Sequence, residues 1–162
     1  MEYQSQELPT NSNEICYEDE YMLIINKASG ENSEQLPIKG FVVHRLDQRV
    51  SGLMILAKTT AVQTLLTQQL ANGLIKKQYK AVTALKEGLM EGGTLNHFIV
   101  HNQQKQKAFI VKEGTAKAKK AVLHYSTIQQ SQKYCLLVIN LISGRFHQIR
   151  AQLAYIGLPI VG

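Results

Sequence analysis

Apolar and polar residues alternate along most of the chain, and this pattern predicts a fold dominated by β-strands. Residues 15–26 are rich in β-branched and aromatic side chains, with an interruption at Asp19 and Glu20, which indicates two short strands or a hairpin. The apolar run at residues 53–57 is typical of a buried strand. Further strands are expected at residues 41–43, 75–83, 94–101, 107–111, 121–128 and 134–142.

Two segments have the spacing of amphipathic helices instead. Residues 59–73 begin with threonines that can cap a helix and end at Asn72-Gly73. Residues 143–159 carry apolar side chains at helical spacing after Gly144, and Gly157-Leu158-Pro159 ends the segment. We therefore expect one helix in the middle of the chain and one near its C-terminus.

The composition indicates one globular domain. The chain has 162 residues, 44% of them apolar, which is enough for one sizeable core. Residues 1–14 are polar and lack the pattern of a signal peptide, so we expect a flexible leader. No apolar run reaches the about 18 residues that span a membrane, so we expect a cytoplasmic protein with no membrane partner. Cys16 and Cys135 lie outside any CxxC pair and are expected to be core thiols.

Charge is distributed unevenly along the chain. Residues 1–40 contain eight carboxylates and two lysines, a net charge of −6. Residues 41–162 contain 16 lysines and arginines and four carboxylates, a net charge of +12. Such a basic region favours contact with a polyanion, and nucleic acid is the commonest polyanion in the cytosol. The cluster of lysines 105, 107, 112, 117, 119 and 120 either binds RNA or serves solubility.

A group of ionisable residues precedes the apolar run at 53–57. His44, Arg45 and Asp47 lie close to residues expected to be buried, where charges are costly unless they are paired or used. One interpretation is a turn stabilised by Arg45 and Asp47, with His44 as a satisfied core imidazole. The other is a carboxylate held in a dry cleft as a nucleophile or base.

Two further segments combine charge with a defined local structure. Residues 144–150 open the second predicted helix, whose N-terminus favours anions such as phosphate, and His147 and Arg150 would share one face. A solvated charged face explains the same spacing. In residues 76–80 the strand pattern places Lys77 and Tyr79 on one side. Tyr79 then either lies among cations at a site or packs in the core.

Metal and nucleotide sites find no support in the sequence. His44 and Asp47 are three residues apart and His97 and His101 four, but in strands or turns we do not expect these spacings to place side chains on one face, as they would on a helix. No glycine-rich phosphate loop or dinucleotide-binding fingerprint is present. We therefore expect neither a metal nor a nucleotide cofactor.

Taken together, several ordered motifs resemble the RluA-type pseudouridine synthase family. The resemblance covers nearly everything after residue 15, including residues 17–21 and 25–30. Ala28 stands where the family commonly has Pro, and Val50 where Thr is usual. The matching motifs are HRLD at 44–47 with Ser51-Gly52, AKT at 57–59, KQYKA at 77–81, GRFHQIR at 144–150 and GLPIVG at 157–162.

The resemblance implies an α+β pseudouridine synthase fold, with a central mixed, mostly antiparallel sheet flanked by helices. Residues 15–162 would form the catalytic domain, incomplete at its C-terminus because the family continues beyond the position of Gly162. The implied reaction converts uridine to pseudouridine in structured RNA, ribosomal or transfer, without cofactor or metal. Nothing suggests an obligate partner besides RNA, so we expect a monomer.

The resemblance also assigns roles to residues. Asp47 would be the catalytic carboxylate that attacks either C1′ of the sugar or C6 of uracil. Tyr79 would stack on the base and assist proton removal, and Arg145 would ion-pair with the carboxylate. Arg45 would in addition fill the space that the flipped base leaves. RNA contacts are expected from His44, Arg45, Lys77, His147, Gln148 and Arg150.

Two other functions remain open at this point. The chain is alternatively a catalytically silent RNA-binding fragment of the same fold, which would bind RNA in a salt-dependent way without isomerisation. A nucleoside glycosidase with an Asp nucleophile is a weaker alternative, and it would release free uracil.

Overall fold

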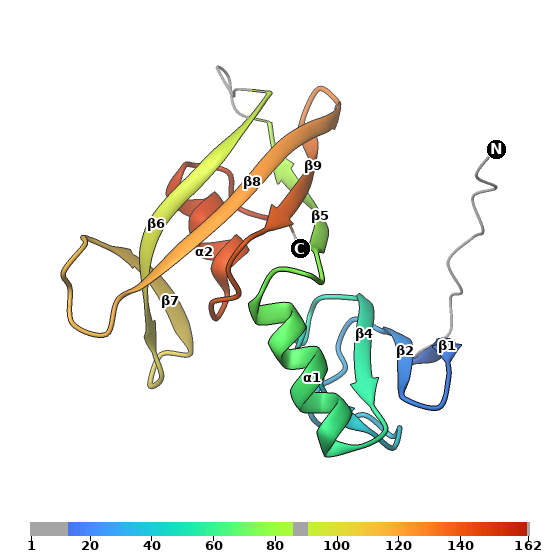
Figure 1. Cartoon of the computed structure of the whole chain (residues 1–162). Coiled ribbons are helices and arrows are strands. Elements are labelled where there is room, and N and C mark those ends of the chain that lie inside the picture. The colour runs from blue at the N-terminus through green and yellow to red at the C-terminus, as the bar shows by residue number, and fades with distance from the viewer. Residues whose placement is uncertain (1–12, 86–90, 162) are drawn as a thin grey trace. The chain divides into compact units, whose positions relative to one another are not determined.

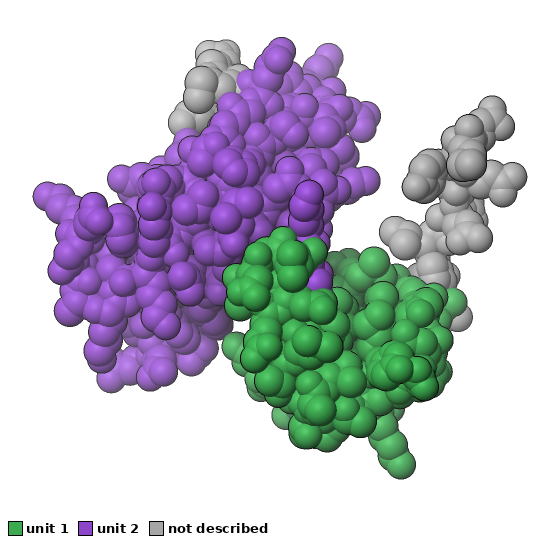
Figure 2. Space-filling view, viewed as in Figure 1, with its two compact units in different colours: residues 1–74 green, residues 75–162 purple. Residues whose placement is uncertain are grey.

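The computed structural model describes residues 13–85 and 91–161. The chain divides into two compact units, Met1–Leu74 and Ile75–Gly162, and each is described by itself (Figures 1 and 2). The expected leader at residues 1–14 lies outside the described residues except for its last two, and Glu14 begins the first strand. No helix among the described residues is long and apolar enough to cross a membrane.

The first unit contains an antiparallel sheet in the order β1-β2-β4-β3. Of the two arrangements expected near residue 20, the structure has the hairpin, because residues 14–18 and 22–27 pair antiparallel. In the turn between them, Asp19 accepts hydrogen bonds from the backbone N–H groups of Tyr21 and Met22, both at 2.8 Å. The strands are β1 Glu14–Glu18, β2 Met22–Lys27, β3 Phe41–Val42 and β4 Gly52–Ala57.

Only one face of this sheet forms the core. In β2 the buried positions alternate with half-buried ones, as the period of a strand requires. The prediction of a wholly buried β4 is wrong in part, because Leu53 is 56% exposed while Met54 and Leu56 are buried. The predicted helix is confirmed as α1, Thr60–Ala71, capped by Thr59 at its start.

The second unit contains an antiparallel sheet in the order β5-β9-β8-β6-β7. All five strands predicted for this part of the chain are present. They are β5 Lys77–Ala84, β6 Gly92–Asn102, β7 Lys107–Val111, β8 Lys119–Gln130 and β9 Tyr134–Leu141. Buried side chains from β5, β6, β8 and β9 pack with Leu153 and Leu158 to form the core.

The two cysteines differ in burial. Cys135 is buried in β9, as expected, whereas Cys16 is exposed. The prediction for Cys16 is wrong because β1 is an edge strand whose residues are all exposed. Both thiols are free.

The second helix, α2, spans Gln148–Tyr155 and begins later than predicted. His147 precedes it with a φ of 47°, a left-handed conformation that a helix cannot continue through. Phe146 therefore lies in the preceding loop, and the prediction that His147 and Arg150 share a helix face is wrong.

Candidate active site

Asp47 lies in the first unit, on the connection between β3 and β4. Its side chain is half-buried, and it follows the buried Leu46. The Val50 backbone donates a hydrogen bond to the Asp47 carbonyl at 2.9 Å, which closes a turn. We refer to residues 46–49 as the Asp47 loop. It holds a carboxylate at the boundary between core and solvent.

The Asp47 loop is held by hydrogen bonds from residues 27–33. The Ser33 hydroxyl contacts the backbone of Leu46, and Ser29 Oγ donates to the Arg49 carbonyl at 2.9 Å. Gly30 and Gln48 exchange two hydrogen bonds, since Gly30 N donates to Gln48 O at 2.7 Å and Gln48 Nε2 donates to Gly30 O at 2.9 Å. The backbone is thus fixed on both sides of Asp47.

Lys27 is the charged member of this arrangement and is fully buried at the end of β2. Its Nζ donates to the carbonyls of Ala28, Glu31 and Gln48 at 2.8, 2.9 and 3.2 Å. Burial lowers the pKa of Lys27, and the charges of Glu31 and Asp47 act in the opposite direction. Lys27 was not among the predicted site residues, although its inward position in an apolar strand is a signal that the sequence contains.

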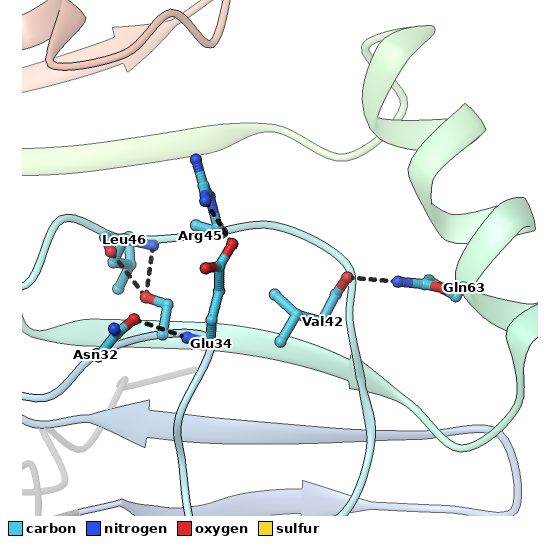
Figure 3. Close-up of polar contacts among 7 residues, drawn as sticks. Asn32, Glu34, Val42, Arg45, Leu46 and Gln63 are labelled. Carbon is cyan, nitrogen blue, oxygen red and sulfur yellow. Dashed lines mark hydrogen bonds and ion pairs between the residues drawn. The ribbon is translucent and has the colours of Figure 1, made fainter. Parts of the chain in front are cut away.

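Arg45 and His44 both have partners within the first unit. Arg45 Nη1 donates to Glu34 Oε1, and Figure 3 shows the two side chains pointing toward one another. Both are well exposed, so the pair contributes only about 0–1 kcal/mol to stability. His44 Nε2 accepts from the Ile55 backbone N–H at 3.3 Å, which requires that nitrogen to be unprotonated. This contact accounts for one of the two ring nitrogens of His44, so the interpretation of His44 as a satisfied imidazole stays a prediction.

The first helix is tied to the same region of the first unit. Gln63 of α1 donates from Nε2 to the Val42 carbonyl at 2.8 Å (Figure 3). Val42 ends β3, five residues before Asp47. The start of the segment that leads to Asp47 is therefore fixed as well.

In the second unit, Lys77 and Tyr79 lie on the same side of β5, as predicted, and this side is the more buried one. Tyr79 packs against the core cluster. A Cβ atom at Gly144 would lie 2.9 Å from Lys77 Nζ, so the ammonium group lies close to the Gly144 backbone. Burial, with a smaller contribution from the charge of Arg145, lowers the pKa of Lys77. Lys77 and Arg145 thus form a cationic cluster beside Gly144.

Arg145 lies on residues 143–147, which we call the Arg145 loop. Its Nε donates to the Lys120 carbonyl at 2.9 Å, which fixes the guanidinium at one nitrogen. Its backbone N–H and the Ser143 hydroxyl both donate to Gln148 Oε1, at 3.0 and 2.9 Å. The loop therefore takes its shape from the first residue of α2.

Gln148 and Gln152 form a buried amide ladder beneath this loop. Gln148 is 2% exposed, and its Nε2 donates to Val122 O at 3.1 Å and to Gln152 Oε1 at 3.0 Å. Gln152 Nε2 in turn contacts the carbonyls of Leu95 and Ala121. The Gln148 amide makes its hydrogen bonds inside the protein. The prediction that Gln148 contacts RNA does not fit this burial, and we assign Gln148 a structural role instead.

The histidines of β6 lie on one face of the strand, contrary to the expectation from their spacing, because side chains four apart on a strand point the same way. His97 contacts Gln152 at 3.1 Å and stacks edge-on against Tyr155. His101 stacks on Phe146 with ring centroids 3.9 Å apart. Each imidazole thus has its own partner, and no three potential metal ligands gather within residues 13–85 and 91–161.

The remaining RNA-contact candidates surround the Arg145 loop. His147 stacks on Phe146 with centroids 3.8 Å apart, so Phe146 lies between two imidazole rings. Arg150 is half-buried on α2. The second unit therefore brings Lys77 together with the Arg145 loop, and Tyr79 lies two residues further along β5. The expected ion pair between Asp47 and Arg145 joins residues of different units and stays a prediction.

The fold and motifs define a class of RNA-modifying proteins. A family model for RNA pseudouridylate synthase matches residues 20–155, a range that includes parts of both units. The chain belongs to this family, which confirms the resemblance drawn from the motifs. That residues 15–162 act as one catalytic domain stays a prediction.

Curated relatives and solved structures agree with this assignment. "Ribosomal large subunit pseudouridine synthase D" of Xylella fastidiosa is 32% identical over 92% of this chain and 50% of its own length. The protein of the same name from Haemophilus influenzae is 32% identical over 99% of this chain and 53% of its own. The chain thus spans about half the length of these relatives.

The similarity in structure supports the fold alone. "Human RNA Pseudouridylate Synthase Domain Containing 4" matches with a TM-score of 0.76 at 23% identity, over 91% of this chain and 66% of the human chain. "Human RNA Pseudouridylate Synthase Domain Containing 1" matches with a TM-score of 0.78 at 18% identity, over 96% and 70%. The expected α+β pseudouridine synthase fold is confirmed.

Proposed function

We propose that this chain converts uridine to pseudouridine in structured RNA and that Asp47 is the nucleophile. The observation that carries the proposal is a half-buried carboxylate on a loop whose backbone is fixed on both sides. A nucleophile that must meet one carbon atom gains from such fixation. The names of the curated relatives favour ribosomal over transfer RNA as the substrate.

The reaction is an isomerisation and balances without a co-substrate. Asp47 attacks C1′ or C6, the bond between N1 and C1′ breaks, and the uracil rotates. A bond then forms between C5 and C1′. The hydrogen on C5 leaves as a proton, N1 gains a proton, and the carboxylate is released. No atom is added and no electron is transferred to another molecule.

Residues of the second unit complete the proposed machinery. Tyr79 provides a ring on which the base stacks, with its hydroxyl near the proton that leaves C5. Arg145 provides the cation that orients the Asp47 carboxylate. Its Nε is engaged by Lys120 O, so the guanidinium is held while its terminal nitrogens can still donate. Lys77, held beside Gly144, adds positive charge for an RNA phosphate.

The target uridine must leave the base stack before it can react. Flipping costs a few kcal/mol, and stacking on Tyr79 together with phosphate contacts offsets this cost. We propose that Arg45 exchanges Glu34 for RNA and occupies the space of the flipped base. An exposed ion pair is weak enough to be exchanged in this way.

The decisive experiment incubates the purified chain with unmodified ribosomal RNA and measures both pseudouridine and free uracil by mass spectrometry. We expect pseudouridine from the wild type and at least a 1,000-fold lower rate from Asp47→Asn, on the order of the loss of a nucleophile. Glu113→Gln removes an exposed carboxylate of the second unit and is the matched control, expected to keep the wild-type rate.

The alternatives give different results in the same assay. Free uracil in place of pseudouridine would identify a glycosidase. RNA binding that is salt-dependent, unaffected by Asp47→Asn and without either product would identify a silent RNA-binding protein. Pseudouridine formation by Asp47→Asn at the wild-type rate would refute the assignment of the nucleophile.

A further inference from the structure

We propose that Ser33 is a positioning residue for Asp47, acting through the backbone of Leu46. This inference rests on the proposed function, because it concerns how the nucleophile is held. Ser33 lies in the polar stretch between β2 and β3, 13 positions before Leu46. Nothing in its sequence neighbourhood distinguishes it from a solvent-exposed loop serine.

The Ser33 hydroxyl acts as donor and acceptor toward one residue. Its Oγ donates to the Leu46 carbonyl at 2.7 Å and accepts from the Leu46 backbone N–H at 3.1 Å. The Leu46 carbonyl belongs to the peptide bond with Asp47. The Ser33 hydroxyl therefore holds the peptide plane on the N-terminal side of Asp47, and the orientation of this plane contributes to the direction of the Asp47 side chain.

The contact is shielded from water. Ser33 is 4% exposed and Leu46 is 9% exposed. A buried backbone group that loses its partner without access to water costs about 1–3 kcal/mol. The loop would accordingly rearrange to satisfy these groups when the hydroxyl is removed, and the Asp47 carboxylate would move with it.

Ser33 is itself held in place. The Asn32 side chain accepts from the Glu34 backbone N–H, and the Asn32 carbonyl accepts from Gln35 N–H, both at 3.0 Å (Figure 3 shows the first). These bonds form a turn that contains Ser33. The Ser33 hydroxyl is therefore carried by a hydrogen-bonded turn. A side chain that positions another residue needs such a rigid support.

The chain offers a matched control in Ser131, in the turn between β8 and β9. Its Oγ accepts from Tyr134 N–H at 3.0 Å and donates to Tyr134 O at 3.2 Å, the same pair of contacts to one backbone residue. Ser131 is exposed and belongs to the other unit. Ser33→Ala therefore removes this pair of contacts close to Asp47 along the chain. Ser131→Ala removes the corresponding pair far from Asp47 along the chain.

The test measures kcat and KM on unmodified ribosomal RNA, together with NMR of the free protein. For Ser33→Ala we expect kcat to fall about 10- to 100-fold with KM within about twofold, because a misplaced nucleophile slows the chemical step and leaves RNA binding intact. The Asp47 amide and carboxyl resonances should shift, and the Leu46 amide should exchange about tenfold faster or more. Ser131→Ala should keep kcat and these resonances.

A second pair of variants separates the hydroxyl from side-chain volume. The side chains of threonine and valine have the same shape, and only threonine carries a hydroxyl. The variants Ser33→Thr and Ser33→Val therefore differ in the hydroxyl alone. We expect the threonine variant to retain kcat within about threefold and the valine variant to behave like Ser33→Ala. Equal loss in both, or no loss in either, would overturn the proposal.

Failure of the positioning role is distinguishable from failure of the proposed function. If the wild type forms no pseudouridine, the proposed function fails. The NMR measurements on Ser33→Ala then still decide whether Ser33 fixes Asp47. Unchanged Asp47 resonances and unchanged Leu46 exchange in Ser33→Ala would overturn the positioning role in either case.

Discussion

The Asp47 loop and the Arg145 loop each present a charged residue on irregular backbone, yet they are held by different chemistry. Backbone groups of the Asp47 loop are bonded by a buried ammonium and a buried hydroxyl that precede it in the chain. The Arg145 loop is bonded by the neutral amide of Gln148, which follows it on α2. In both cases the fixation comes from buried polar side chains rather than from apolar packing of the loop itself.

This difference has an energetic consequence. The amide ladder beneath Arg145 is uncharged and continuous with the core of the second unit, because Gln152 also bonds to β6 and β8. The Asp47 loop depends in part on Lys27, a charge whose burial costs free energy that its three carbonyl partners offset. We therefore expect the ladder to contribute more to stability than the ammonium does.

The largest effect is predicted for Gln152→Leu. Leucine is of similar size but removes the buried hydrogen bonds that Gln152 makes to the Leu95 and Ala121 carbonyls and to the Gln148 amide. We expect a loss of about 3 kcal/mol in the free energy of unfolding, measured by urea denaturation. The same change at the exposed Gln68 of α1 is the control, and an equal loss there would contradict the role of the ladder.

A smaller loss is predicted for Lys27→Met. The variant removes three hydrogen bonds to carbonyls but also removes the cost of burying a charge, so the two effects partly cancel. We expect about 1–2 kcal/mol less stability. Lys39→Met changes an exposed lysine of the same unit and should be neutral. A loss larger than that of Gln152→Leu would reverse the comparison between the loops.

The smallest effect is a dependence on pH in the second unit. Burial lowers the pKa of His97 from its usual 6.5, so the unfolded chain binds the proton more tightly than the folded chain. Stability contributed by the neutral ring is therefore lost as pH falls through about 6.5. Replacing His97 by Gln should flatten the unfolding free energy between about pH 7.5 and about pH 5.5. An unchanged slope would contradict this contribution.

Much of the fold was predictable because its signals are local. Strand alternation identified β5 to β9, and Thr59 with Asn72-Gly73 identified α1, since caps and periodicity act over a few residues. The start of α2 was not predictable in this way. The start of α2 depends on the left-handed conformation of His147. A glycine at this position would have signalled such a conformation, whereas a histidine does not.

The candidate site was predictable only for its charged residues. The density of charge beside a buried strand pointed to Asp47, but the residues that fix it come from a polar stretch without periodicity. Gln148 was misread because an amide within a basic motif suggests RNA contact, and only its four internal partners show otherwise. Ser33 acts on a backbone residue 13 positions away, for which no local pattern exists. Lys27 does carry a local signal, because it is a lysine at a buried position of the alternating strand β2.

The most direct test of the central claim is to express this chain in cells that lack their own enzymes of this type and to map pseudouridine in total RNA. We expect new modified sites that are absent when Asp47→Asn is expressed at the same level. These sites would also identify the RNA substrate. Sites that appear equally with Asp47→Asn, or no sites from a folded wild-type chain, would contradict the claim that this chain isomerises uridine through Asp47.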